Sequence, residues 1–343
     1  MISRDGGACT AGRWLRTLPV MDAADLRTLH RLMLVARRLD EEAIALQRQG
    51  VLPAYAPAKG QEAAQVASGA ALDLNRDFAF PTYREVGVAV GMGVDLAAYL
   101  ASHRNIWHGG LYDPQSSRLA PLNAIVGGPV LHAVGWAMGA KLDGTGGAAI
   151  AYFGDGASSQ GDVHEAMNFA GVYRLPVVFF CQNNGWAISV PTERQVAGGS
   201  VAARAASYGI ESLRVDGNDA VAVFEATRAA LERARDGGGP TVIEAMTYRM
   251  GPHSTSDDPG RYRTLEDEQA WTGRDPLVVA AQQLTADEVA AAEENAAAVV
   301  REVRESLVSL DVRPGEELFS FVYREPTKSL LAQQRAWKEH LDA

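Results

Sequence analysis

Three short apolar runs that end in glycine or polar residues constrain the fold of this chain more than any other feature. The runs are AAIAYF before Gly154, VVFFC before Gln182 and TVIEAM before Thr247. Helical patterns lie between them, for example the stretch GDVHEAMNFAGVY. Apolar strands that alternate with helices form a mostly parallel sheet with helices on both faces. The sequence therefore predicts an α/β protein built on such a sheet.

The apolar periodicity also predicts how the chain is divided. Residues 1–21 lack a regular pattern, and we expect a flexible N-terminus there. Helical spacing from residue 22 opens an α/β domain that extends to residue 325, and residues 326–343 form a helical tail. The Gly-, Pro- and Ser-rich stretch 107–123 is expected to be a long surface loop, which in a compact domain usually has a function.

The composition argues against several classes of protein. The chain has 343 residues and a net charge of −10, which disfavours nucleic acid or an anionic membrane as a main partner. No apolar run approaches the ~20 residues that cross a bilayer, and the first residues lack the apolar region of a secretory signal. Cys9 and Cys181 lie in a loose terminus and a strand, which disfavours a disulfide framework. We therefore expect a cytoplasmic protein.

Polar groups at the ends of two predicted strands indicate a ligand site, because ligands of open parallel sheets bind at the carboxyl ends of strands. The first end is Gly154-Asp155-Gly156, whose glycines let backbone N–H groups approach a phosphate. Asp155 alone would repel a phosphate, but Mg²⁺ between them would bind both. The second end offers the amide oxygen of Asn184 and, in the following turn, the carbonyl of Trp186. Together the two ends predict a magnesium–phosphate site.

The spacing of the two strand ends makes this prediction more specific. A lone Gly-Asp-Gly is as often only a tight turn. Here the stretch between Asp155 and Asn184 leaves room for one helix and one strand, as a βαβ unit requires. The combination is similar to the signature of proteins that bind thiamin diphosphate (ThDP).

The chain resembles the α subunit of the decarboxylating component of 2-oxo acid dehydrogenase complexes, the branched-chain type more than the pyruvate type. The resemblance extends from residue 26 to residue 276 and is carried by FPTYREVGV, NAIVGGPVLHAVG, YFGDGASSQGDVHEAMNFA, QNNGWAIS, LRVDGND and IEAMTYRMGPHSTSDDPGRYR. It implies a ThDP-binding fold and an α₂β₂ heterotetramer with ThDP between α and β. It also implies oxidative decarboxylation of a branched-chain 2-oxo acid, with reductive acylation of a lipoyl group on a partner acyltransferase.

The resemblance assigns cofactor contacts by position. A guanidinium suits phosphate oxygens, so the physical chemistry of the pair Tyr83-Arg84 agrees with its assigned role at the diphosphate. The implied residues are Asp155, Asn184 and the carbonyl of Trp186 for Mg²⁺; Gly156, Ala157, Tyr83, Arg84 and Arg249 for the diphosphate or the loop around it; and Ala124 and Val126 for the aminopyrimidine.

His253 is the residue to which the resemblance assigns catalysis. It follows the third strand and would reach the reacting end of ThDP, where a histidine can hold or donate a proton near neutral pH. As alternatives, a lone loop histidine is more often a solvated bystander, and Tyr83-Arg84 alone is more often a core aromatic beside a surface ion-pairing residue. Ser254 lies where mitochondrial relatives are phosphorylated, and a phosphate there would repel the site.

The chain departs from the family pattern at three positions. Gly128-Pro129 stand where branched-chain members carry a potassium-binding Thr-Gln pair, which argues against that ion here. Gln182 stands where those members carry an Arg that contacts the diphosphate. The change predicts either weaker ThDP binding or a larger share of the phosphate contact for Arg84 and Arg249.

The sequence leaves alternatives open both for the substrate and for the class of function. The stretch YREVGV resembles branched-chain members, because pyruvate-type relatives carry a His at the position of Val86, whereas NAIVGG is pyruvate-like. The α subunit of a pyruvate or acetoin dehydrogenase is therefore the nearest alternative. A non-catalytic module that binds ThDP or a partner is the alternative from another class.

Overall fold

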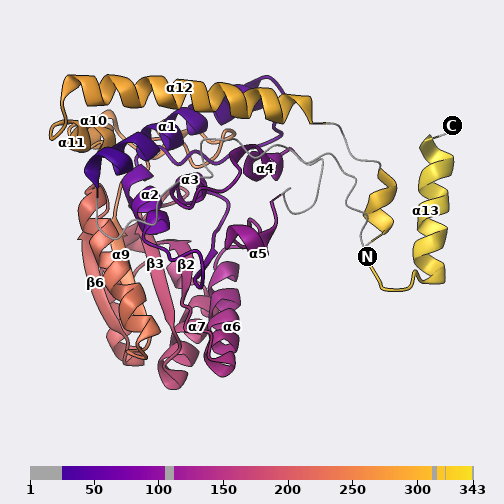
Figure 1. The fold of residues 1–343 in the computed structure, drawn as a ribbon, viewed down its shortest axis with the longest axis horizontal. Helices are drawn as coiled ribbons and strands as arrows, with labels where there is room; N and C mark the ends of the chain where they lie inside the picture. The colour runs from indigo at the N-terminus through magenta and orange to yellow at the C-terminus, as the bar shows by residue number, and fades with distance from the viewer. Residues whose placement is uncertain (1–24, 105–111, 311–314, 321, 342–343) are drawn as a thin grey trace. The chain divides into compact units, whose positions relative to one another are not determined.

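The computed structural model describes residues 25–104, 112–310, 315–320 and 322–341 (Figure 1). The chain divides into two compact units, one up to Val308 and the other from Ser309. The N-terminus for which we expected flexibility, with Cys9, lies outside the described residues. Within the second unit, Trp337 of helix α13 (Lys328–Leu341) packs on Phe319 of the short helix η5 (Gly315–Phe319).

The centre of the first unit is a five-stranded parallel sheet in the order β1-β2-β3-β7-β6. The predicted α/β class with a mostly parallel sheet is confirmed. β3 is buried along its whole length, whereas β6 is an edge strand with no fully buried residue. The strands are β1 (Phe78–Phe80), β2 (Ala149–Gly154), β3 (Val177–Asn183), β6 (Glu211–Asp216) and β7 (Thr241–Met246).

Helices cover both faces of the sheet because successive side chains of each buried strand point to opposite faces. On one face, Phe153 of β2 belongs to a core with Val163 and Met167 of α7, and α6 completes that layer. On the other face, the Tyr152 hydroxyl donates to Ser68 Oγ of α2 at 3.1 Å. The helices that form these two layers are α2 (Glu62–Ala70), α6 (Gly128–Asp143), α7 (Gly161–Tyr173) and α9 (Ala220–Arg235).

A further group of helices surrounds the carboxyl edge of the sheet. α1 begins after Asp25, whose side chain accepts hydrogen bonds from the first backbone N–H groups. The long α12 runs beside α1 (Figure 1), and Arg38 pairs with Glu293 at 2.9 Å between them. These helices are α1 (Leu26–Arg48), α3 (Val86–Gly91), α4 (Leu96–Ala101), α10 (Leu265–Thr272), α11 (Pro276–Ala281) and α12 (Ala286–Ser309). The short α8 (Val201–Ala205) instead packs with α7 in the core on one face of the sheet.

The expected surface loop at residues 107–123 is only partly right. Its first residues, 107–111, lie outside the described ranges. The described remainder contains a short helix, α5 (Pro114–Ser117), and buries Tyr112 and Leu119. Leu119 also forms a bridge to Ala79 of β1, so this stretch is anchored to the sheet because it carries apolar side chains between its polar ones.

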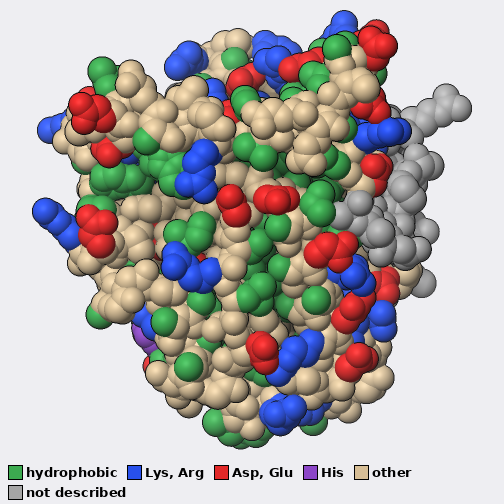
Figure 2. Space-filling view, turned by 90° about the vertical axis from the view of Figure 1, so that its left-hand side faces the viewer, with side chains coloured by type: hydrophobic (Ala, Val, Ile, Leu, Met, Phe, Trp, Pro, Cys, Tyr) green, Lys and Arg blue, Asp and Glu red, His purple; other side chains and the backbone are tan. Residues whose placement is uncertain are grey.

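Charged side chains of both signs are mixed on the surface. Figure 2 shows Lys and Arg side chains interspersed with Asp and Glu on the described part of one face, without the continuous basic stripe that a nucleic-acid backbone requires. No helix within the described ranges is both long enough and apolar enough to span a membrane.

Candidate active site

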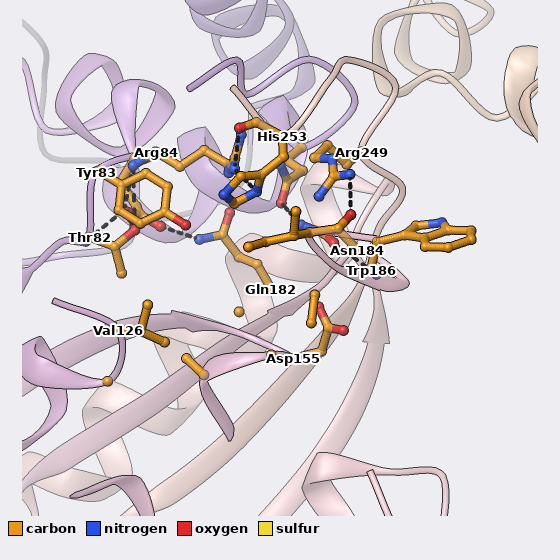
Figure 3. A pocket seen from close by; sticks show the side chains of 18 of the residues that line it. Thr82, Tyr83, Arg84, Val126, Asp155, Gln182, Asn184, Trp186, Arg249 and His253 are labelled. Carbon is orange, nitrogen blue, oxygen red and sulfur yellow. Dashed lines mark hydrogen bonds between the residues drawn. The ribbon is translucent and has the colours of Figure 1, made fainter. Parts of the chain in front are cut away.

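A cavity of about 250 Å³ lies at the carboxyl ends of β2 and β3 (Figure 3). The turns after β1, β2, β3 and β7 and the turn before α6 form its wall, so the sheet edge collects segments that are far apart in sequence. Ala124 is exposed and does not line the cavity, although its neighbour Ile125 does. The other predicted site residues all line it: Tyr83, Arg84, Val126, Asp155, Gly156, Ala157, Asn184, Trp186, Arg249 and His253.

Asp155 is a buried carboxylate without a cationic partner among the described residues. It is 1% exposed, and its Oδ2 accepts hydrogen bonds from Thr192 Oγ1 at 2.6 Å and Gln195 Nε2 at 3.1 Å. Burial raises the pKa of Asp155 above its usual value, despite these two neutral donors. A buried anion of this kind fits a cation that binds from the cavity. Sequence analysis did not find Thr192 and Gln195, which orient it.

Asn184 is held by local and distant groups. Its Oδ1 accepts the Trp186 N–H at 3.2 Å, and its Nδ2 donates to Gln61 Oε1 at 3.3 Å. Gly185, between Asn184 and Trp186, has a φ of 86°, a left-handed conformation that glycine adopts without strain. Gln61 Nε2 is buried and has no hydrogen-bond partner in the described part of the chain, although Gln61 lines the cavity. A ligand acceptor would satisfy it.

The predicted metal ligands do not form a cage of their own. Among the described residues, no group of three or more His, Cys, Asp or Glu side chains could hold a metal ion. The predicted set has one carboxylate, one amide and one backbone carbonyl, so phosphate oxygens and water would have to complete an octahedron. The residues therefore fit a cation that binds together with a diphosphate.

Arg84 and His253, which both line the cavity, contact each other. Arg84 Nη2 lies 3.1 Å from His253 Nδ1 and donates to the His253 carbonyl at 2.9 Å. Because a guanidinium only donates, His253 Nδ1 accepts and the ring proton is on Nε2. Burial, then Arg84 and Arg249, lowers the pKa of His253 to about 4. His253 is therefore neutral near pH 7.

Arg249 joins two loops of the site. Its Nη2 donates to the Ile188 carbonyl at 2.8 Å and to the Tyr262 hydroxyl at 2.9 Å. Burial and the neighbouring Arg84 lower its pKa, which is the effect of two cations in one buried place. Within the described ranges neither Arg84 nor Arg249 forms an ion pair with a carboxylate. An anion in the cavity would relieve this repulsion.

The loop that carries His253 is ordered by its own side chains. Asp257 Oδ2 accepts the His253 N–H at 2.7 Å and the Tyr262 hydroxyl at 2.5 Å. Arg263 donates to the carbonyls of Arg249 and Gly251. Because of these contacts, the loop is held by the protein and is not freely solvated.

A buried network fixes the Tyr83-Arg84 turn, and sequence analysis missed it. Glu85 Oε2 accepts the Thr82 N–H at 2.7 Å, and its Oε1 accepts Gln182 Nε2 at 2.7 Å. Gln65 Nε2 in turn donates to Gln182 Oε1 at 2.9 Å. Both the Nε2 and the Oε1 atoms of Gln182 thus form hydrogen bonds within the protein. An acid directly before the apolar helix VGVAVG was the only sequence signal for this network.

Ile188 lines the cavity in a strained conformation, in the hairpin of β4 (Trp186–Ala187) and β5 (Val190–Pro191). Its φ is 56°, which for a β-branched residue costs ~1–2 kcal/mol. Such strain concentrates at functional sites.

We expect Ile188→Gly to raise the free energy of unfolding by ~0.5–1 kcal/mol, after the entropy cost of glycine, and to weaken cofactor binding. Thermal melts and calorimetric titration measure both, and unchanged affinity would remove Ile188 from the site.

The fold and the cavity together define an α/β protein with a polar cavity at the carboxyl edge of its sheet. The chain belongs to the dehydrogenase E1 component family, which matches residues 30–308. It is 41% identical to the 3-methyl-2-oxobutanoate dehydrogenase subunit alpha of Mycobacterium tuberculosis (strain ATCC 25618 / H37Rv), over 99% of this chain and 93% of that protein.

Relatives named for pyruvate are also similar to this chain. The pyruvate dehydrogenase E1 component subunit alpha of Bacillus cereus is 39% identical over 94% of this chain and 88% of its own length. The protein of the same name from Bacillus subtilis (strain 168) is 43% identical over 76% of this chain and 70% of its own length. The family recognised from the sequence is confirmed, and with it a component of a ThDP-dependent 2-oxo acid dehydrogenase. Alpha subunits of this family generally pair with beta subunits and an acyltransferase.

Proposed function

We propose that this chain is the α subunit of a dehydrogenase that oxidatively decarboxylates a branched-chain 2-oxo acid and acylates the lipoyl group of a partner acyltransferase. The charge arrangement in the cavity carries the proposal. Buried Asp155 lies on the side opposite Arg84 and Arg249 (Figure 3), and none of the three has an ion-pair partner among the described residues. One cavity with a cation side and an anion side fits a magnesium diphosphate.

Each part of the cofactor has residues that fit it. ThDP, when bound, supplies the electron sink that decarboxylation needs. An added Cβ at Gly156 would lie 2.7 Å from Ala187 Cβ, so only glycine lets this turn pack against the β4–β5 hairpin. The proposed contacts are Asp155, Asn184 and the Trp186 carbonyl for Mg²⁺; Gly156, Ala157, Tyr83, Arg84 and Arg249 for the diphosphate; and Val126 for the aminopyrimidine. Ala124 is assigned to the aminopyrimidine by the resemblance alone, because it does not line the cavity.

We assign proton handling to His253. As a neutral ring with its proton on Nε2, it can donate a hydrogen bond from that nitrogen to a substrate oxygen and move the proton when charge develops there. Arg84 holds the ring by Nδ1, and Asp257 holds the His253 backbone. This support fixes the orientation of the Nε2–H group before the substrate binds.

A β subunit would complete the site. Ile125 at the rim of the cavity is 69% exposed, and Ile188 is 54% exposed. Apolar side chains around an open binding site are typical of a surface that a partner covers. The lipoyl-bearing acyltransferase would then reach the cofactor from the assembled α₂β₂ heterotetramer.

Steady-state kinetics of the chain reconstituted with its β subunit test the substrate class. We expect kcat/KM for 3-methyl-2-oxobutanoate to exceed that for pyruvate by at least about tenfold, because each added methylene in an apolar pocket is worth ~1–3 kcal/mol. An artificial electron acceptor makes the assay independent of the acyltransferase. A higher kcat/KM for pyruvate would instead favour the pyruvate-type function of the Bacillus relatives. Cofactor binding without turnover of any 2-oxo acid would favour a non-catalytic module.

A further inference from the structure

The segment Tyr55–Gly60 links helix α1 to the loop that carries His253. On the loop side, the Thr255 N–H donates to the Tyr55 carbonyl at 2.9 Å, and the Tyr55 N–H donates to Thr255 Oγ1 at 3.3 Å. Further along, the Met250 N–H donates to the Lys59 carbonyl at 3.0 Å. The segment therefore supports the loop on both sides of His253.

The same segment also holds Arg84. The carbonyl of Pro57 accepts a hydrogen bond from Arg84 Nη1, while Arg84 Nη2 contacts His253. At the end of the segment, Gly60 has φ of 92°, and an added Cβ there would lie 2.2 Å from the Tyr248 carbonyl oxygen. The contacts fix where the segment runs, and its position decides where the Arg84 guanidinium lies.

A single buried acid ties this segment to α1. Asp40 is 1% exposed, and its Oδ1 accepts the Ala58 N–H at 2.7 Å and the Tyr55 hydroxyl at 2.9 Å. These bonds bracket Pro57. Asp40 Oδ2 has no hydrogen-bond partner among the described residues. Asp40 therefore holds the segment through the two bonds to Oδ1 alone.

We propose that Asp40 is a positioning residue for the diphosphate and His253 side of the site, acting through the segment Tyr55–Gly60. The inference rests on the proposed function for the identity of the ligand. Asp40 does not line the cavity, and it acts only through the two hydrogen bonds that bracket Pro57. Loss of these bonds frees the Pro57 carbonyl, and with it both Arg84 and the loop at Thr255.

The charge of Asp40 gives a second readout. Burial is the main reason that the pKa of Asp40 is raised to about 6. The charge of Glu62 also raises it, while the hydrogen bonds from the Ala58 N–H and Tyr55 and the charge of Arg84 lower it. The folded pKa exceeds the ordinary value of 3.8, so the ionised acid costs stability in full above about pH 6. This cost shrinks as the pH falls from 6 toward 3.8 and is absent below that. An amide keeps the acceptor oxygen and removes this cost.

The test compares Asp40→Leu, Asp40→Asn and Tyr55→Phe in the reconstituted α/β protein. For Asp40→Leu we expect amide exchange at residues 253–257 of the cofactor-free protein to accelerate at least about tenfold, and the Kd for ThDP with Mg²⁺ to rise by a similar factor. For Asp40→Asn, both the exchange rate and the Kd should stay within about threefold of the values of the unchanged protein. The values for Tyr55→Phe should fall between those of the two Asp40 variants. Thermal melts should show Asp40→Asn more stable than the unchanged protein at pH 8, with the difference shrinking as the pH is lowered from about 6 toward 4.

Two results would overturn the inference. One is unchanged exchange and affinity in Asp40→Leu. The other is equal impairment of Asp40→Leu and Asp40→Asn, which would make the charge rather than the acceptor responsible. If the unchanged protein takes up no ThDP, the proposed function fails. The exchange experiment on the cofactor-free protein still decides the role of Asp40 in that case.

Discussion

Replacing Asp155 by Asn is expected to abolish the magnesium-dependent uptake of ThDP. The loss in affinity should exceed about 100-fold, because groups that only orient a metal ligand are already worth ~10–100-fold. Thr192 and Gln195 can donate to the amide oxygen as they do to Oδ2, so the turn should keep its shape. Titration calorimetry of the reconstituted α/β protein, with and without Mg²⁺, measures the effect.

Asp162 offers a matched control for this experiment. It is an exposed acid in the first turn of α7, outside the cavity. Asp162→Asn removes the same charge a few residues along the chain and should leave ThDP affinity within about twofold, because exposed charges contribute little. Retained magnesium-dependent binding in Asp155→Asn would show that Asp155 is only a buried polar residue of a turn.

Replacing His253 by Ala should separate turnover from cofactor binding. We expect kcat to fall ~10²–10⁴-fold, the usual range for a lost proton-transfer group. The Kd for ThDP should rise only a few-fold, because the Arg84 guanidinium keeps its bond to the Pro57 carbonyl. Steady-state kinetics with an artificial acceptor and calorimetric titration of the same preparation supply the two numbers.

An exposed histidine of the second unit, His340 in α13, serves as the control substitution. His340→Ala should change neither kcat nor the Kd. Parallel losses of kcat and cofactor affinity in His253→Ala would make His253 a cofactor anchor, and unchanged kcat would make it a bystander of the loop.

Most of the fold could be predicted from the sequence because its signals are local. Each buried strand is a short apolar run, and each helix carries its own periodicity, so the βαβ unit from β2 to β3 is visible without tertiary information. The strand ends with Asp155 and Asn184 follow from this, because parallel neighbours bring their carboxyl ends to one edge. Residues 112–123 were harder, since their polar composition hid three buried side chains, Tyr112, Leu119 and Ala120.

The sequence by itself determined the parallel sheet and the two polar strand ends, because both depend on residues that are close along the chain. Only the tertiary structure decided which distant groups share the cavity. The strand order inserts β7 between β3 and β6, which brings His253 beside Arg84, far away in sequence. The protonation of His253 and the role of Asp40 likewise depend on burial and on partners from other elements. Such non-local contacts leave no periodic pattern in a sequence.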